Sequence, residues 1–191
     1  DFIESSSLPT EIATFTVHAF TEINNEKDHL AITIGNILKS DPVLARIHSQ
    51  CITGESFFSL RCDCRFQLSE SLKRIAERET GIIFYLQQEG RGIGLSNKIR
   101  AYKLQDDGFD TVEANHQLGF HEDERNYEIV SAMAKHLKIK SIDLMTNNPK
   151  KIDAIEKSGL KINKRIPIKS ESNDHNKSYL NTKAKKLGHL M

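Results

Sequence analysis

Short apolar segments rich in β-forming residues alternate with helical segments along this 191-residue chain, and this alternation most restricts its fold. Strands are predicted at residues 11–20, 29–35, 43–48, 81–86, 141–146 and 159–168. The first two are joined by a polar turn and are expected to pair antiparallel. Helices are predicted near 66–79, 96–105, 123–137 and 150–158, with a loop over 113–120. The pattern predicts an α/β fold, a layered single domain with a mixed β-sheet flanked by helices.

The chain is long enough for one compact domain with a buried core. Residues 1–170 are expected to form this domain. Residues 171–191 are polar and basic, and they predict a partly disordered tail with a short helix near its end and little core. The chain begins at Asp1 without a methionine, which is consistent with a segment cut from a longer polypeptide.

Charge and composition exclude several classes of protein. Twenty-seven Lys and Arg against 26 Asp and Glu leave a net charge of +1, so no general footprint for nucleic acid or an anionic membrane is present. No apolar run reaches the roughly 20 residues of a membrane span, and the N-terminal residues do not resemble a signal peptide. We therefore expect a cytoplasmic protein, whose thiols stay reduced.

The chain's three cysteines fall in one stretch, CITGESFFSLRCDC, as Cys51, Cys62 and Cys64. A structural zinc is held by four protein ligands, whereas a catalytic zinc has three and keeps one position for water. Three clustered thiols therefore favour a catalytic metal site. The alternatives are ordinary core cysteines, a disulfide pair, or a structural zinc whose fourth ligand is His48 or another residue.

A glycine-rich segment, QQEGRGIGL at residues 87–95, follows the predicted strand at 81–86. It lacks the GK[ST] of a Walker phosphate loop and does not fit G-x-G-x-x-G. Taken alone, it is a weak signal for nucleotide binding.

Five segments in order carry a resemblance: HSQCITGESFFSLRCDC, QQEGRGIGL, NKIRAYKLQDDGFDTVEANHQLGF, DERNY and TNNPKK. Together they resemble the GTP cyclohydrolase II family, over residues 43–167 and more weakly over 182–191. The resemblance implies that residues 1–170 form the catalytic domain. It also implies hydrolysis of GTP to 2,5-diamino-6-(5-phosphoribosylamino)pyrimidin-4(3H)-one, formate and pyrophosphate, the first committed step of riboflavin biosynthesis.

The resemblance also implies the cofactors and the assembly. Cys51, Cys62 and Cys64 would hold one Zn²⁺ per subunit. Mg²⁺ is expected with the GTP triphosphate, since it neutralises charge during phosphoryl transfer. The family likeness further implies a homodimer, with neither nucleic acid nor membrane as a partner.

Three catalytic residues follow from the same resemblance. Tyr102 would lie near the metal and orient water or the formamide. Asp123 matches a proposed proton acceptor and Arg125 a proposed nucleophile at the α-phosphorus. Because a guanidinium keeps its proton above about pH 12, stabilising phosphoryl charge is the better-founded role for Arg125. The alternatives are a half-buried helical tyrosine and an acidic helix start.

The resemblance implies GTP contacts for twelve residues: Arg46, Ile47, His48, Ser49, Gln50, Gln67, Glu89, Gly90, Arg91, Thr111, Thr146 and Lys151. Lys151 begins a predicted helix, where backbone amides and an ammonium can meet phosphate. Its alternative is a solvated surface lysine.

Two positions depart from the family pattern. Gln50 stands where glutamate is common, and Arg65 where glycine is usual. The first removes a negative charge beside Cys51, and the second places a side chain where the backbone was expected to need a positive φ.

Three functional classes stay in view: a zinc-dependent GTP hydrolase, a non-catalytic zinc-containing guanine nucleotide-binding protein, and a zinc-stabilised nucleic-acid module. Only 7% of residues are aromatic and the net charge is near zero, which disfavours the third. Loss of a thiol, Tyr102 or Arg125 would favour the second, and all of these residues are present.

Overall fold

The computed structural model describes residues 1–170, 172–186 and 188. Its strands are β1 (Phe2–Pro9), β2 (Thr14–Glu22), β3 (Lys27–Ile34), β4 (Val43–Ser49), β5 (Gly81–Leu86), β6 (Ser141–Met145) and β7 (Lys161–Ile166). Its α-helices are α1 (Ile52–Glu55), α2 (Cys64–Glu77), α3 (Leu95–Asp106), α4 (Thr111–Gln117), α5 (Glu128–His136), α6 (Pro149–Lys157) and α7 (Lys177–Lys185). Two 3₁₀ turns, η1 (Ile37–Lys39) and η2 (Glu89–Gly92), complete the elements.

The seven strands form one mixed sheet in the order β1-β2-β3-β5-β4-β6-β7. The pairs from β1 to β5 are antiparallel, and those joining β5, β4, β6 and β7 are parallel. The central strand β5 is apolar and almost wholly buried, as expected for a strand covered on both faces. The predicted α/β fold with a mixed sheet is confirmed.

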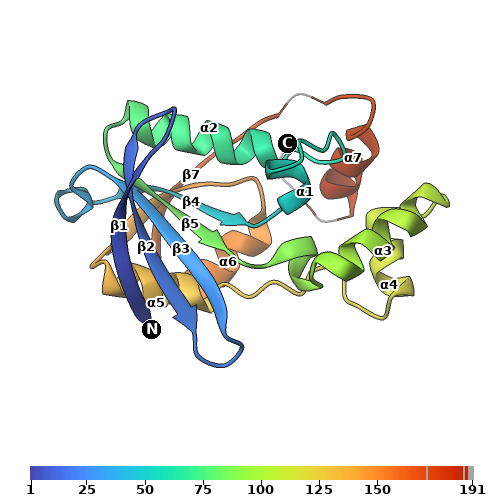
Figure 1. Ribbon diagram of the computed structural model, residues 1–191, viewed down its shortest axis with the longest axis horizontal. Coiled ribbons are helices and arrows are strands. Elements are labelled where there is room, and N and C mark those ends of the chain that lie inside the picture. The colour runs from blue at the N-terminus through green and yellow to red at the C-terminus, as the bar shows by residue number, and fades with distance from the viewer. Residues whose placement is uncertain (171, 187, 189–191) are drawn as a thin grey trace.

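Helices cover the sheet on both faces (Figure 1). One apolar cluster joins α5 and α6 to the sheet through Val130, Met133 and Ile155. A second cluster on the other face joins α2 through Ile75 and includes Phe15. Helices α3, α4 and α7 lie beyond the end of the sheet toward which β4 and β5 point (Figure 1). In open α/β sheets this carboxyl end is where ligands bind.

The loop predicted over 113–120 is wrong, because α4 occupies most of it. Asp110 caps this helix by accepting hydrogen bonds from the amides of Val112 and Glu113, while the Glu113 side chain accepts one from the Asp110 amide. This reciprocal capping box satisfies helix amides that would otherwise lack partners. The Asp-x-x-Glu spacing was available in the sequence.

The helix predicted over 123–137 begins later, at Glu128. The preceding residues follow an irregular path because their polar groups bind elsewhere. The Asp123 carboxylate accepts from the Arg125 amide, and the Gln88 side chain donates to the Asn126 carbonyl. Strand β1 was not predicted, since its sequence FIESSSLP is exposed at the sheet edge and lacks an apolar face.

The C-terminal segment contains the expected short helix, α7, but this helix is not free of core contacts. Leu180 and Asn176 are buried, and α7 contacts α4. The domain boundary at residue 170 remains a prediction. Partial disorder was predicted for 171–191, and residues 171, 187 and 189–191 of this segment lie outside the described residues. Within the described chain, each helix falls short of the length or apolarity required to cross a membrane.

Candidate active site

A cavity lies at the carboxyl ends of β4, β5 and β6 and is lined by residues from the segments after them and from α2, α3, α4 and α7. It brings together the three cysteines, Tyr102, Arg125 and eleven of the twelve predicted GTP contacts: Arg46, His48, Ser49, Gln50, Gln67, Glu89, Gly90, Arg91, Thr111, Thr146 and Lys151. Ile47 is buried behind the cavity and takes part through its carbonyl, which accepts a hydrogen bond from Lys151 Nζ at 2.8 Å.

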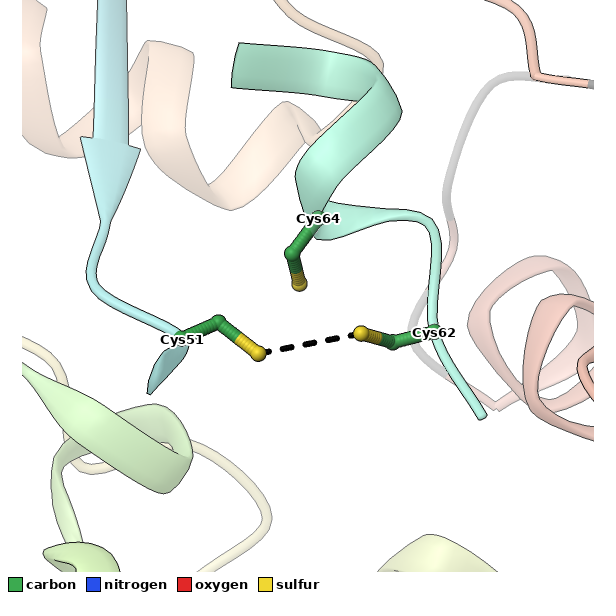
Figure 2. Close-up of side chains that lie close together, drawn as sticks. All are labelled: Cys51, Cys62 and Cys64. Carbon is green, nitrogen blue, oxygen red and sulfur yellow. Dashed lines mark hydrogen bonds between the residues drawn. The ribbon is translucent and has the colours of Figure 1, made fainter. Parts of the chain in front are cut away.

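The three thiols meet at one point. Cys51 follows β4, Cys62 ends the loop after α1, and Cys64 begins α2, and their sulfurs lie within 4.8 Å of one another. Figure 2 shows the three side chains directed toward a shared centre. All three are free thiols, with 3.7 Å between the sulfurs of Cys51 and Cys62, so the disulfide alternative is wrong.

A fourth protein ligand does not join this group among the described residues. His48 Nε2 lies 2.8 Å from Glu55 Oε1 and is held there. Burial lowers the His48 pKa, so the ring is neutral near pH 7 despite this carboxylate. The structural-zinc alternative with His48 as fourth ligand is therefore not supported, and the three-donor set has an open corner.

The donor set and its surroundings fit a divalent metal. The Cys51 pKa is lowered by hydrogen bonds from Cys62 and Cys64 and by the Lys98 ammonium, while the contact with Cys51 and burial raise the Cys62 pKa to about 11. Because ionisation of one thiol opposes ionisation of its neighbours, a bound cation would be needed to make all three into thiolates, the form that binds metal. Gly54 leaves room for this arrangement, since an added Cβ would lie 2.8 Å from the Cys62 sulfur and 3.2 Å from the Cys51 sulfur.

Glu55 orients the first cysteine, and sequence reasoning missed it. Its Oε1 accepts a hydrogen bond from the Cys51 amide at 2.9 Å and contacts His48, while its Oε2 accepts one from the Tyr85 hydroxyl at 2.6 Å. Burial, followed by this bond, raises the Tyr85 pKa. The carboxylate therefore links β4, β5 and α1 directly behind the thiol cluster.

Glu89 and Lys98 form a second support. Lys98 Nζ lies 2.7 Å from Glu89 Oε1, 2.8 Å from Thr53 Oγ1 and 3.2 Å from the Cys51 sulfur. The other carboxylate oxygen of Glu89 accepts a hydrogen bond from the Ile52 amide at 2.7 Å. Glu89, predicted only as a GTP contact, thus also ties η2 to the start of α1. Lys98 carried no recognisable sequence signal.

Tyr102 lies on α3 with its hydroxyl 3.4 Å from Thr53 Oγ1, which in turn is 3.8 Å from the Cys51 sulfur. Burial raises the Tyr102 pKa, so the phenol keeps its proton and can donate a hydrogen bond. Tyr102 is a half-buried helical tyrosine, as the alternative expected, and its side chain also lines the cavity.

Arg125 and Asp123 form a two-bonded pair. Arg125 Nε and a terminal nitrogen lie 2.7 and 2.6 Å from the two carboxylate oxygens. Burial acts to raise the Asp123 pKa, but Arg125 lowers it further, so the net shift is downward. Burial acts to lower the Arg125 pKa, but Tyr127 and Asp123 raise it, so the net shift is upward. Arg125 lines the main cavity, whereas Asp123 lines an adjacent one with it. Since α5 begins at Glu128, the helix-start alternative is wrong.

Cations without carboxylate partners gather at one part of the cavity. Both terminal nitrogens of Arg91 and the Nε of Arg46 are buried without a hydrogen-bond partner in the described chain. Burial lowers the Arg46 pKa to about 10, and burial together with Arg46 and Arg125 lowers that of Lys151. Lys151 is buried, so the surface-lysine alternative is wrong. Such a group is stabilised by a polyanion.

Of the two departures from the family pattern, Gln50 lines the cavity and Arg65 is accommodated in a helix. Arg65 lies within α2 in ordinary helical conformation, and its guanidinium stacks 3.9 Å from the centre of the Phe58 ring. The expected need for a positive φ there is wrong. Among the described residues that line the cavity, left-handed backbone occurs at Gly90 and Arg91, with φ of 63° and 61°. A non-glycine residue in this region is strained, which is common at ligand sites.

Comparison with known proteins agrees with this geometry. The family profile described as GTP cyclohydrolase II matches residues 2–167. The chain is 53% identical over 190 residues to GTP cyclohydrolase-2 of Azotobacter vinelandii, covering 100% of this chain and 91% of that protein. The same protein of Hahella chejuensis is also 53% identical, with coverage of 100% and 92%.

A solved structure supports the fold alone. It is a two-domain 3,4-dihydroxy-2-butanone 4-phosphate synthase from A. baumannii, matched with a TM-score of 0.51 at 16% identity over 90% of this chain and 40% of that one. The family assignment depends on the sequence relatives, which are similar over the whole of this chain and over 91% and 92% of their own length. With the profile match and the site geometry in agreement, the chain belongs to the GTP cyclohydrolase II family.

Proposed function

We propose that this chain hydrolyses GTP to 2,5-diamino-6-(5-phosphoribosylamino)pyrimidin-4(3H)-one, formate and pyrophosphate, the first committed step of riboflavin biosynthesis. The proposal depends on one observation: a cluster of thiols and a group of buried cations lie in one cavity. Three thiols lie in the same cavity as buried guanidinium nitrogens that have no hydrogen-bond partner among the described residues. Family membership supports the same reaction.

The reaction consumes three waters. Two add at C8 of guanine, first breaking the ring C–N bond to leave a formamide and then releasing formate, and one cleaves the bond between the α- and β-phosphates. Cys51, Cys62 and Cys64 would hold Zn²⁺, which supplies Lewis acidity and acidifies water at its open position. Tyr102 donates a hydrogen bond to the oxygen of the formamide, orienting it for the second addition.

The phosphate step depends on charge. Arg125 keeps its proton beside Asp123, so its role is to stabilise the negative charge that develops on the phosphates. The lowered pKa makes Asp123 a weak base, and its strong bonds to Arg125 support an orienting role. Arg46, Arg91 and Lys151 supply further positive charge, and Mg²⁺ accompanies the triphosphate.

The assembly and location belong to the same proposal. A cytoplasmic homodimer is expected from the family likeness, and sedimentation at micromolar concentration measures the assembly directly.

The test of the activity is to incubate the purified chain with GTP and Mg²⁺ while following formate, pyrophosphate and the pyrimidine. Equal amounts of formate and pyrimidine are expected. Cys51→Ser should lose both zinc and turnover, because two sulfur donors hold the metal poorly. A parent protein that binds GTP and zinc but releases neither formate nor pyrophosphate would instead be a non-catalytic binder.

A further inference from the structure

The C-terminal helix α7 lies against the cavity, although its sequence predicted a polar tail. Tyr179 and Lys183, four residues apart and so on one face of the helix, both line the cavity. Lys183 is only 8% exposed. A lysine is rarely buried without a specific partner, so its surroundings need an explanation.

The partner of Lys183 is Asp63, the residue between two of the metal-binding cysteines. Lys183 Nζ lies 2.7 Å from Asp63 Oδ1, and both side chains are almost wholly enclosed. Asp63 Oδ2 accepts a hydrogen bond from Gln67 Nε2 at 2.6 Å. Gln67 Oε1 in turn accepts one from Arg46, so the chain of contacts runs from α7 through the Cys62–Cys64 turn to the buried cations.

Tyr179 makes a second contact. Its ring centre lies 4.5 Å from Lys183 Nζ and 5.7 Å from the guanidinium carbon of Arg91. The terminal nitrogens of Arg91 have no hydrogen-bond partner in the described chain, and the Tyr179 ring lies within range of a cation–π contact with this guanidinium. Burial raises the Tyr179 pKa to about 12, and the ring is therefore neutral.

We propose that Lys183 and Tyr179 of α7 are positioning residues of the active site: Lys183 fixes the Cys62–Cys64 turn through Asp63, and Tyr179 orients Arg91 toward the nucleotide. This inference rests on the proposed function for the identity of the metal and the nucleotide. Residues that orient metal ligands from behind change metal affinity by about 10- to 100-fold when they are removed. The helix therefore forms part of the binding machinery.

The first experiment measures zinc affinity on the full chain without nucleotide, by competition with a chromophoric chelator. Lys183→Met should weaken zinc binding by about 10-fold or more. Lys183→Arg, which keeps a cation for Asp63, should recover most of this loss. The matched control is Lys185→Met, an exposed lysine on the same helix, which should bind zinc as the parent does.

If Lys183→Met does not fold, Asp63→Asn tests the same ion pair. This variant removes the charge on residue 63 but keeps an oxygen that can accept the hydrogen bond from Gln67. It should also weaken zinc binding, and the double variant should lose less than the two single losses combined, since both remove one interaction. Equal zinc affinity in Lys183→Met, Asp63→Asn and Lys185→Met would overturn the inference for Lys183. A parent that binds no zinc would instead refute the proposed function.

The second experiment separates KM from kcat. Tyr179→Leu should raise the KM for GTP by about threefold to 30-fold, the range of a cation–π contact, with zinc affinity unchanged. Tyr179→Phe keeps the ring and should recover most of that loss. An unchanged KM in Tyr179→Leu, or an equal effect on zinc affinity, would overturn the role of Tyr179.

Discussion

Gly54 offers the sharpest test of the metal site, because it is the place where a single methyl group meets the sulfur cluster. The residue lies in α1 and is buried. A Cβ there would stand 2.8 Å from the Cys62 sulfur, 3.2 Å from the Cys51 sulfur and 3.5 Å from the Cys64 Cβ. Its backbone is not in the left-handed region, so alanine adds no backbone strain.

The expected magnitude follows from these contacts. Forcing one extra carbon into a packed site costs about 1–3 kcal/mol. In the metal-free protein the thiols can turn away from the methyl group, whereas bound metal requires them to converge. The cost therefore falls on the metal-bound form, and about 1–3 kcal/mol corresponds to zinc binding weaker by about 5- to 150-fold. The gain in helix propensity of about 1 kcal/mol occurs in both forms and cancels.

The assay is chelator competition on Gly54→Ala, with thermal unfolding of the metal-free and zinc-loaded forms. The metal-free variant should be as stable as the parent or slightly more so, while zinc should raise its melting temperature less. Ser56→Ala, which places alanine at an exposed position directly after the same helix, is the control and should bind zinc normally. Zinc affinity in Gly54→Ala equal to that of the parent would refute the proposed position of the metal.

Three further predictions concern the reaction. Tyr102→Phe should slow formate release by about 100-fold or more, as loss of a positioned proton donor does, with zinc content unchanged; formate measured against bound zinc checks this. Arg125→Lys should reduce kcat for pyrophosphate release by about 100-fold, because an ammonium cannot make two parallel bonds to phosphate or Asp123, and equal rates would contradict its role. Burial, Arg46 and Arg125 lower the pKa of Lys151, and the negative charge of a bound triphosphate should raise it again. At a pH between the pKa values of the free and nucleotide-bound protein, binding should therefore take up as much as about one proton. Calorimetry with a non-hydrolysable GTP analogue in buffers of different ionisation heat measures the uptake, and uptake that persists in Lys151→Met would contradict this assignment.

The inner strands β4, β5 and β6 were predictable because they are short, mostly apolar runs with clear ends. GIIFYL reads as a buried strand, and β5 lies at the centre of the sheet. Strand order was not predictable, since the pairing of β4 with both β5 and β6 depends on contacts between distant parts of the chain. The edge strand β1 was missed because FIESSSLP carries no apolar periodicity and is stabilised by its pairing with β2.

The cluster of cysteines was predictable because three rare residues within fourteen positions favour a shared metal site. The groups behind them were not. Glu55, Lys98 and Lys183 look like ordinary surface charges in the sequence, yet each contacts the thiol region from a different element. A sequence does not indicate which charged side chains become buried, because burial depends on how separate elements pack.

The C-terminal helix shows the same limit. Its polar, basic sequence is typical of a solvated tail, whereas Lys183 is buried because Asp63, 120 residues earlier, compensates its charge. A charged side chain in the sequence is therefore not always exposed, because the fold can place a side chain of opposite charge beside it.

We propose that the ring opening requires zinc, held by the thiolates of Cys51, Cys62 and Cys64 with a position left for water. The most direct measurement is zinc per chain by elemental analysis, paired with formate release from GTP before and after chelation. We expect one zinc per chain, loss of formate release when zinc is removed, and return of formate release when zinc is restored. Full formate release from metal-free protein would contradict this proposal.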